Sequence, residues 1–355
     1  MIPTPLRRTA ALAVAAASLL AVAPAAAPAK PQDLKVMVRN VYLGADLIPL
    51  ALAQNREEFE RATWQRYQTV LRNDFATRAK SLAAEIRAQK PDLIGVQEAA
   101  IWRTGPKDGG ATRPNDVVYD STELLLKELA NRGTPYRVAR ARDWFDLEAP
   151  TDDGDPATTD VDVRLTQRDV ILVRRGSKVR ITRKFAGGFT NHFDVNTHAG
   201  LAQSLRGWVG VDGTLAGRRF RFVTTHLEAY SPEIAQQQME QLLRQPLASK
   251  RRQSILVGDF NSAPGANAND RGTSRDASAY YEAIEAGFRN PLPRRATCCF
   301  AEDLHSTADR LETWIDHLVV RPRVRALRSG IVGTRQVGGL VPSDHAGIWA
   351  TLRLR

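Results

Sequence analysis

Several short apolar segments of this chain carry a carboxylate, an amide or an imidazole at one end. Such segments are typical of buried β-strands. Strand ends are rigid, and side chains placed there can converge without a separate loop to hold each one. Charged groups are seldom buried without a partner, so one shared site explains the set better than many independent structural roles. The residues at these ends are Asn40, Glu98, His226, Asp259, Asn261, Asp316, Asp344 and His345.

Strands and helices alternate along the sequence, which predicts a fold that contains both. One helix is expected to bury Phe75, Ala79, Leu82 and Ile86, which recur at spacings of three and four. Asp212-Gly213 is typical of a hairpin turn. The other expected helices are 121–130 and 232–244, and the expected strands are 34–40, 93–96, 169–173, about 205–211, 219–225, 254–257, 313–320 and 345–354. Segments 151–160 and 261–278 are expected to be surface loops, and no linker divides the chain, so 30–355 is predicted to be one domain.

The first residues have the features of an export signal. Arg7 and Arg8 precede the apolar run 10–23, and Ala27-Pro28-Ala29 offers small residues to a signal peptidase. We therefore expect 1–29 to be removed and the protein to be secreted. A membrane anchor is the alternative, but the run is short and rich in alanine. The arginine pair is also compatible with twin-arginine export.

The chain is basic, with 50 Lys and Arg residues against 39 Asp and Glu. Removal of 1–29 takes away two arginines and leaves a net charge of +9. Such a charge favours contact with polyanions, whether nucleic acid, anionic lipid or cell-wall polymer. The arginines are scattered, and Arg72, Arg78 and Arg87 are expected to form a solvated helix face. No obligate protein partner is predicted.

The two cysteines, Cys298 and Cys299, are adjacent, which excludes a disulfide scaffold and a zinc finger. Export would permit their oxidation, although two buried thiols are the commoner outcome. Any metal must therefore be held by oxygen and imidazole ligands. Carboxylate and amide oxygens suit a hard cation, which predicts Mg²⁺, or else Mn²⁺ or Ca²⁺. The histidines are then available for proton transfer.

Six motifs, in order along the chain, carry a resemblance to a known family. They are Arg39-Asn40-Val41, Val96-Gln97-Glu98, Thr225-His226-Leu227-Glu228, Gly258-Asp259-Phe260-Asn261-Ser262, Trp314-Ile315-Asp316-His317 and Ser343-Asp344-His345-Ala346. This series resembles the endonuclease/exonuclease/phosphatase family, which includes deoxyribonuclease I, abasic-site exonucleases, inositol-polyphosphate phosphatases and bacterial sphingomyelinases. The resemblance implies an α+β fold, a four-layer α/β/β/α sandwich of two packed, mainly antiparallel mixed sheets flanked by helices.

The resemblance also implies a metal-binding group and a phosphate-binding group. Glu98 is similar to the carboxylate that holds the metal, with Asn40 beside it, and Asp344 adds a metal contact or supports a ligand. Asn261 is similar to a residue that positions the phosphoryl group. His226 matches a histidine that either binds the phosphate or protonates the leaving oxygen.

The catalytic roles follow from the same resemblance. Asp259, with Asn261, is similar to the pair that positions the attacking water. His345 matches the histidine that receives the proton of that water, and Asp316 matches its carboxylate partner. The implied activity is metal-dependent hydrolysis of a phosphodiester by in-line attack of water.

The substrate is less well defined by the sequence than the chemistry. A nuclease is favoured by the positive charge and the export signal. A sphingomyelinase-like phospholipid phosphodiesterase is the alternative and needs an exposed apolar hairpin, for which only Trp102 and Trp144-Phe145 are candidates. An inositol-phosphate-type phosphatase needs a closed basic pocket. A non-catalytic binding module of the same fold is the most distant alternative, because a retired site has no physical reason to keep like charges together.

Overall fold

The computed structural model describes Met1 and residues 32–158, 160–198, 200–265, 275–306 and 310–355. The predicted export signal, 1–29, lies outside the described residues apart from Met1. Part of the expected loop 261–278 also lies outside them. Among the described helices, none is both long enough and apolar enough to cross a membrane.

The helices and strands alternate as the sequence predicts. The helices are α1 (Ile48–Leu52), α2 (Arg56–Arg72), α3 (Phe75–Gln89), α4 (Ser121–Asn131), α5 (Pro232–Arg244) and α6 (Ser278–Glu285), with a 3₁₀ turn at Arg275–Ala277. The strands are β1 (Leu34–Asn40), β2 (Leu93–Gln97), β3 (Ile101–Pro106), β4 (Asp116–Asp120), β5 (Tyr136–Pro150), β6 (Val161–Arg174), β7 (Arg180–Gly188), β8 (Phe193–Thr197), β9 (Gly200–Ser204), β10 (Gly207–Leu215), β11 (Arg218–His226), β12 (Ser254–Asp259), β13 (Asp316–Arg321), β14 (Val324–Val332) and β15 (Gly347–Leu354).

The strands of the described residues form two large sheets and a small hairpin. Sheet A has the order β14-β15-β1-β2-β6-β3-β4, with β5 also paired to β6. Sheet B has the order β13-β12-β11-β10-β7, and β8 pairs with β9. Each large sheet contains one parallel pair, β1–β2 in sheet A and β11–β12 in sheet B. The remaining pairs among these strands are antiparallel, so both sheets are mixed and mainly antiparallel.

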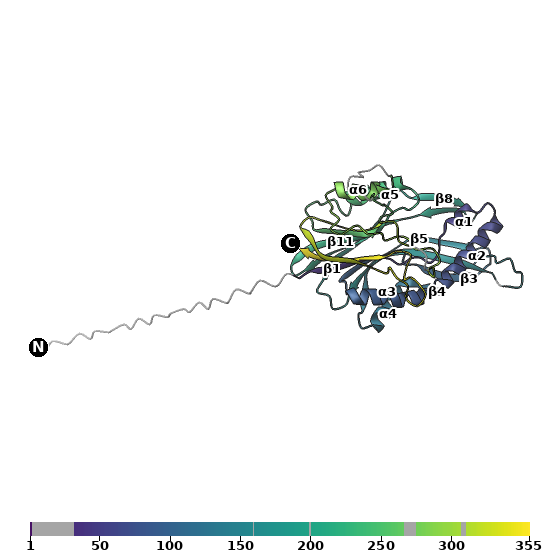
Figure 1. Cartoon of the computed structure of the whole chain (residues 1–355), viewed down its shortest axis with the longest axis horizontal. Helices are drawn as coiled ribbons and strands as arrows, with labels where there is room; N and C mark the ends of the chain where they lie inside the picture. The colour runs from purple at the N-terminus through teal and green to yellow at the C-terminus, as the bar shows by residue number, and fades with distance from the viewer. Residues whose placement is uncertain (2–31, 159, 199, 266–274, 307–309) are drawn as a thin grey trace. The chain divides into compact units, whose positions relative to one another are not determined.

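Four layers account for the burial of the apolar side chains. The central cluster lies between the sheets and joins residues such as Val38 of β1 and Val257 of β12. A second cluster packs α3 and α4 on sheet A, and a third packs α5 and α6 on sheet B. Figure 1 shows these helix pairs on opposite sides of the two sheets. Each sheet buries both faces, which confirms the predicted α/β/β/α sandwich.

The sheets approach closely near the ends of their parallel pairs. Gln97, the last residue of β2, donates from Nε2 to Oγ1 of Thr224 on β11 at 2.6 Å. A Cβ atom at Gly95 would overlap the side chain of Thr224, so a larger residue has no room there. This contact fixes the end of β2 against the end of β11.

The hairpin turn predicted at Asp212-Gly213 is wrong. Strand β10 continues through both residues, with a register irregularity against β7, and ends at Leu215. The turn to β11 lies at Ala216 and Gly217, whose φ angles of 48° and 77° suit the tight turn of a two-residue hairpin. The carboxylate of Asp212 is instead paired with Arg221 on β11, at 2.7 Å.

The solvated helix face predicted for three arginines is wrong at Arg78. Arg72 and Arg87 are exposed, but Arg78 is 1% exposed. Its guanidinium donates to the carbonyl oxygens of Val41 and Pro342, at 2.8 and 3.1 Å. Burial lowers its pKa from the ordinary value. Arg78 therefore joins the segment after β1 to the segment before β15, and both segments carry residues of the site described next.

Candidate active site

The two parallel pairs end at the same end of the sandwich. In sheet A, Asn40 lies opposite Gln97, the residue before Glu98. In sheet B, His226 lies opposite Asp259. Asp316, the first residue of β13, is also opposite Asp259, since β12 and β13 are antiparallel. Strand pairing therefore places His226, Asp259 and Asp316 side by side in sheet B, and the packing of the two sheets brings Asn40 to Asp259.

Asn40 and Glu98 form the sheet A side of the site. The Nδ2 atom of Asn40 donates to Glu98 Oε1 at 2.9 Å and to Asp259 Oδ2 at 3.1 Å, so it spans the two sheets. Its Oδ1 accepts from the backbone of Tyr42, and Glu98 Oε2 accepts from the backbone of Leu43. Glu98 has a φ of 56°, an unfavourable backbone conformation for glutamate and one that recurs at functional sites.

Asp259 is the buried centre of the site. Its Oδ2 atom lies 3.6 Å from His226 Nε2 and 3.7 Å from His345 Nε2, so two imidazoles face one oxygen. Burial, with the nearby charges of Asp316 and Glu98, raises the pKa of Asp259 to about 7. Its Oδ1 accepts from the backbone of Asn261.

His226 is held in one tautomer by its neighbours. The Nη1 atom of Arg206 lies 2.6 Å from His226 Nδ1, and Gln167 Nε2 lies 3.4 Å from the same atom. A guanidinium only donates, so Nδ1 is the acceptor and the ring hydrogen is on Nε2. Burial, the charge of Arg206 and the charge of His345 lower the pKa of His226 well below its ordinary value. His226 therefore presents a neutral N–H donor to the site.

His345 and Asp316 form a buried dyad. His345 Nδ1 and Asp316 Oδ2 are 2.8 Å apart, which leaves Nε2 of the ring facing Asp259. The carboxylates of Asp316, Asp344 and Asp259 outweigh the opposing effect of burial and raise the pKa of His345. Arg39 donates to the carbonyl oxygen of His345 and so fixes the backbone that carries the ring.

Asp344 and Asn261 complete the predicted set. Asp344 accepts from Ser343 Oγ at 3.2 Å, and burial with the charge of Glu98 raises its pKa to about 6. Asn261 follows β12 with a φ of 46°, which asparagine tolerates better than most residues. Its Nδ2 donates to the carbonyl oxygen of Leu227 at 3.0 Å. All eight residues predicted for the site therefore lie at one end of the sandwich.

A hard cation fits the acidic side of this site. A carboxylate oxygen of Glu98 and one of Asp259 lie within 4.8 Å of one another, beside the N–H of His226. Burial and the neighbouring carboxylates raise the pKa values of Asp259 and Asp344, so unneutralised negative charge is concentrated here. Carboxylate oxygens are the ligands that Mg²⁺ and Mn²⁺ prefer. In this geometry Asn40 orients Glu98 and Asp259 through its Nδ2.

Two other polar residues of the motifs, and Asp46 outside them, have structural partners instead. Glu228 is buried and accepts from the backbone of Ala229 and Tyr230. His317 contacts the carbonyl oxygen of Ser262 at 2.8 Å and packs among aromatic rings, and burial lowers its pKa to about 4. Asp46 accepts from the backbone of Ile48.

The cysteine pair lies beside the catalytic dyad. Cys298 and Cys299 are joined by a disulfide bond, the oxidised one of the two states considered for this pair. Cys298 is buried, whereas Cys299 is exposed and its Sγ lies 4.0 Å from His345 Nε2.

Three site residues are missing from the sequence-based set: Arg206, Gln167 and Asp169. Gln167 and Asp169 lie within β6, which begins eight residues earlier than the expected strand. Arg206 lies directly before β10, although the sequence places it inside the strand. Its place near the start of the expected strand, about 205–211, was the one sequence feature that could have indicated a site residue. The fully buried Asp169 accepts from Trp144 Nε1 at 2.9 Å, and burial raises its pKa to about 7.

Solved structures with the same fold are numerous. An endonuclease/exonuclease/phosphatase family protein from Bacteroides thetaiotaomicron superposes with a TM-score of 0.55, is 15% identical, and covers 92% of this chain and 99% of its own. One from Leptotrichia buccalis gives a TM-score of 0.54 at 15% identity, covering 90% and 100%. A mannosyl-6-phosphatase from Bacteroides thetaiotaomicron gives 0.53 at 16% identity, covering 90% and 99%.

At these identities the structural likeness establishes the fold. No curated protein matches the sequence. The model of the endonuclease/exonuclease/phosphatase family matches residues 70–345, which include most of the described domain. That span holds four of the six motifs in full and Ser343-Asp344-His345 of a fifth, and the sixth, at Asn40, joins them through β1. The chain belongs to the endonuclease/exonuclease/phosphatase family.

Proposed function

We propose that this protein is an exported, divalent-metal-dependent phosphodiesterase that acts on nucleic acid. One observation carries the proposal: His226 Nε2 and His345 Nε2 lie 3.6 and 3.7 Å from the same oxygen of Asp259. A phosphoryl group next to that oxygen would meet a donor on one side and a proton acceptor on the other. Family membership supports hydrolysis of phosphoesters as the general activity.

Binding of the phosphoryl group is assigned to His226 and Asn261. Arg206 fixes the hydrogen of His226 on Nε2, so this ring donates a hydrogen bond to a phosphoryl oxygen. A neutral ring with a lowered pKa is a poor acid, and phosphate binding is therefore preferred over protonation of the leaving oxygen. Asn261 holds the loop after β12 through Leu227 and presents the remainder of its amide to the site.

Activation of water is assigned to Asp259, His345 and Asp316. Asp259 orients the water, and the neutral form of His345, which its raised pKa makes a stronger base, accepts the proton at Nε2 while the water oxygen forms a bond to phosphorus. The bond from phosphorus to the leaving oxygen breaks on the opposite side. Asp316 holds Nδ1–H of His345 at 2.8 Å and stabilises the imidazolium that forms.

Metal binding is assigned to Glu98, with Asn40 orienting it and Asp344 adding charge nearby. A divalent cation would neutralise charge on the phosphoryl oxygens and on the leaving oxygen. The hydrogen bond from Leu43 to Glu98 Oε2 keeps this carboxylate in place.

The charge balance favours a phosphodiester over a phosphomonoester. The site contains the carboxylates of Glu98, Asp259, Asp316 and Asp344, against the guanidinium of Arg206 beside His226 and that of Arg78 near Asp344. A phosphodiester has one negative charge and a phosphomonoester has up to two, so the diester meets less repulsion. The aromatic residues considered for lipid contact are covered: Trp102 and Trp144 are buried, and Phe145 is half-buried. Nucleic acid is therefore the preferred substrate class.

An activity panel tests the proposal directly. Purified protein is incubated with plasmid DNA, RNA, sphingomyelin vesicles, bis(p-nitrophenyl) phosphate and p-nitrophenyl phosphate, each with Mg²⁺ and with a chelator. We expect metal-dependent cleavage of a nucleic acid and of the diester. If only the sphingomyelin vesicles are hydrolysed, the substrate is a phospholipid and not nucleic acid. If only the monoester is hydrolysed, the protein is a phosphatase.

A pair of matched variants excludes a contaminating hydrolase. His345→Gln removes the proton acceptor, whereas His192→Gln changes a histidine that pairs with Asp194 outside the predicted set. Loss of activity in the first and retention in the second is expected. Absence of hydrolysis in every arm, with the wild-type fold intact, would instead indicate a binding module.

A further inference from the structure

A basic pocket lies far from the proposed active site. Its volume is about 360 Å³, and it is lined by Arg289, Asn290, Pro291, Val320, Arg323, Val324, Arg325, Ala326 and Arg355. Strand β13 begins at the active site with Asp316 and reaches the pocket at Val320, four residues later and about 13 Å along the strand. The pocket is therefore at the opposite end of β13, where the chain passes from sheet B to sheet A.

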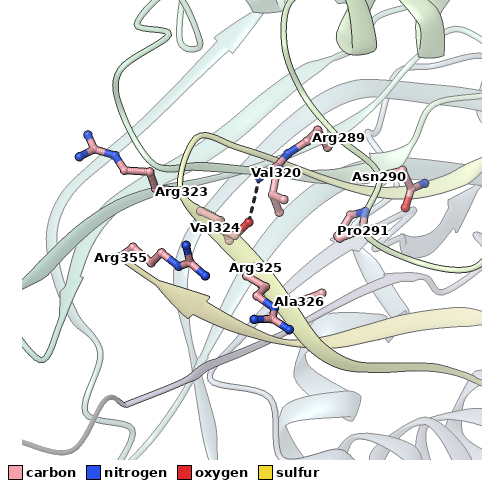
Figure 2. A pocket seen from close by; sticks show the side chains of 9 residues that line it. All are labelled: Arg289, Asn290, Pro291, Val320, Arg323, Val324, Arg325, Ala326 and Arg355. Carbon is pink, nitrogen blue, oxygen red and sulfur yellow. Dashed lines mark hydrogen bonds between the residues drawn. The ribbon is translucent and has the colours of Figure 1, made fainter.

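The pocket concentrates positive charge without compensation. Its four arginines are exposed, none of its lining residues is acidic, and no ion pair to any of the four occurs among the described residues. Arg289 donates weakly to the carbonyl oxygen of Val324, at 3.4 Å. Figure 2 shows the four arginines on three chain segments around Val320 and Val324, with the guanidinium of Arg323 pointing outward.

Two of these arginines occupy positions that do not favour arginine. Arg323 has a φ of 53°, the left-handed region in which glycine or asparagine is preferred. Arg325 lies directly opposite Arg353 in the β14–β15 pair, and like charges at opposed positions are destabilising. Arg353 is itself paired with Asp33. Neither Arg323 nor Arg325 therefore improves the fold locally, which points to a role in binding.

We propose that this pocket binds a small anion with two or more phosphate groups. Guanidinium groups recognise phosphate oxygens through paired N–H donors, and several phosphates are needed to balance several guanidiniums. The volume is in the range of pockets for small ligands and is too small for an extended polymer. The apolar side chains of Val320, Val324 and Ala326 form its floor. This site is separate from the phosphodiester site and does not depend on the proposed function.

Calorimetric titration tests the proposal. The purified full chain, with a chelator present, is titrated with inorganic tripolyphosphate, with inorganic phosphate and with a short single-stranded oligonucleotide. Tripolyphosphate is expected to bind at least about tenfold more tightly than phosphate. A double variant, Arg323→Gln with Arg325→Gln, is expected to weaken tripolyphosphate binding by at least about tenfold. Its Tm is expected to match or exceed that of the wild type, because the like-charge pair of Arg325 and Arg353 is relieved.

The matched control has the same change in net charge elsewhere. Arg87→Gln with Arg137→Gln alters exposed arginines on α3 and β5 and is expected to change tripolyphosphate affinity by less than about twofold. Both double variants should retain phosphodiester hydrolysis. If both double variants weaken tripolyphosphate binding equally, net charge alone accounts for the binding and the proposal is overturned. Binding of the oligonucleotide alone, or of none of the three probes, would overturn it as well.

Discussion

The parallel pair of sheet A and the parallel pair of sheet B end side by side, but they place different chemistry there. In both, a residue with positive φ follows the strand end closely: Glu98 after β2 and Asn261 after β12. The polar groups of sheet A are tied to backbone, since Asn40 and Glu98 accept from Tyr42 and Leu43. Those of sheet B have strongly shifted pKa values, with Asp259 raised to about 7 and His226 lowered.

This difference indicates a division of labour between the sheets. Sheet A provides a fixed carboxylate and an amide that bridges to sheet B, which suits the holding of a cation. Sheet B provides buried groups whose protonation is finely balanced, which suits binding and proton transfer. Substitutions where the parallel pair of sheet B ends should therefore reduce turnover itself, and substitutions at Asn40 and Glu98, where the parallel pair of sheet A ends, should change the metal requirement.

The largest effect is expected from Asp259→Asn on sheet B. The substitution removes the oxygen faced by both imidazoles and should lower kcat/KM by about a thousandfold or more, even at saturating metal. Steady-state hydrolysis of bis(p-nitrophenyl) phosphate measures this. Asp46→Asn, which changes a carboxylate that caps Ile48, should retain activity within about twofold. Near-normal turnover of Asp259→Asn would show that the proposed catalytic role of sheet B is wrong.

Glu98→Gln on sheet A should act mainly through the metal. We expect the Mg²⁺ concentration for half-maximal activity to rise by about tenfold or more, with part of the activity regained at high Mg²⁺. Titration of activity with Mg²⁺, and calorimetry of metal binding to the free protein, both measure the shift. Glu312→Gln, at an exposed carboxylate, is the matched control. An unchanged dependence on Mg²⁺ would show that another residue holds the metal. The proposed division between metal binding on sheet A and proton transfer on sheet B would then be wrong.

The two halves of the site differ in how well the sequence predicts them. Glu98, Asp259 and Asp316 could be predicted from the sequence because each adjoins an apolar strand that is evident there. Their convergence required the pairing of β11 with β12 and of β12 with β13, which the motifs of the family imply but spacing does not show.

Residues that act through tertiary contacts were not predictable in the same way. Arg206 touches His226 only because β10 and β11 pair, with Gly207 opposite His226. Arg78 occupies a helix position that is usually solvated, and it is buried because two loops distant in sequence cover it. The turn at Ala216 was missed because alanine carries no turn preference, whereas Asp212-Gly213 does.

Arg206 is a positioning residue on sheet B, and its substitution tests whether it fixes the tautomer of His226. Arg206→Met should lower kcat/KM by about tenfold, because His226 loses the donor that fixes its tautomer. The ¹⁵N chemical shifts of the His226 ring should change from a single tautomer to a mixture. Gln167→Leu should have a smaller effect, since its contact with Nδ1 is longer, at 3.4 Å. An unchanged tautomer in Arg206→Met would contradict the assigned role.

Asp169→Asn should have the smallest effect on turnover and a distinct effect on stability. Burial raises the pKa of Asp169 to about 7, and the charges of Glu98 and Asp259 add to the rise. The hydrogen bond from Trp144 and the charge of Arg206 lower the pKa but do not outweigh burial. Between about pH 4 and pH 7 the unfolded chain is ionised at this position and the folded protein is not. The stability of the wild type therefore falls as pH rises through this window and stays lower above it.

The asparagine variant lacks this loss, because its amide is neutral at every pH and its oxygen can still accept from Trp144. The free energy of unfolding of Asp169→Asn should match the wild type near pH 4 and exceed it by on the order of 1–2 kcal/mol at pH 8. Urea denaturation across this pH range measures the difference. A variant that is less stable than the wild type at pH 8 would show that pairing with Arg206 outweighs burial, so that the pKa of Asp169 is not raised. Sheet A and sheet B would then share a buried ion pair through β6, and the proposed separation of fixed and finely balanced charges would have to be redrawn.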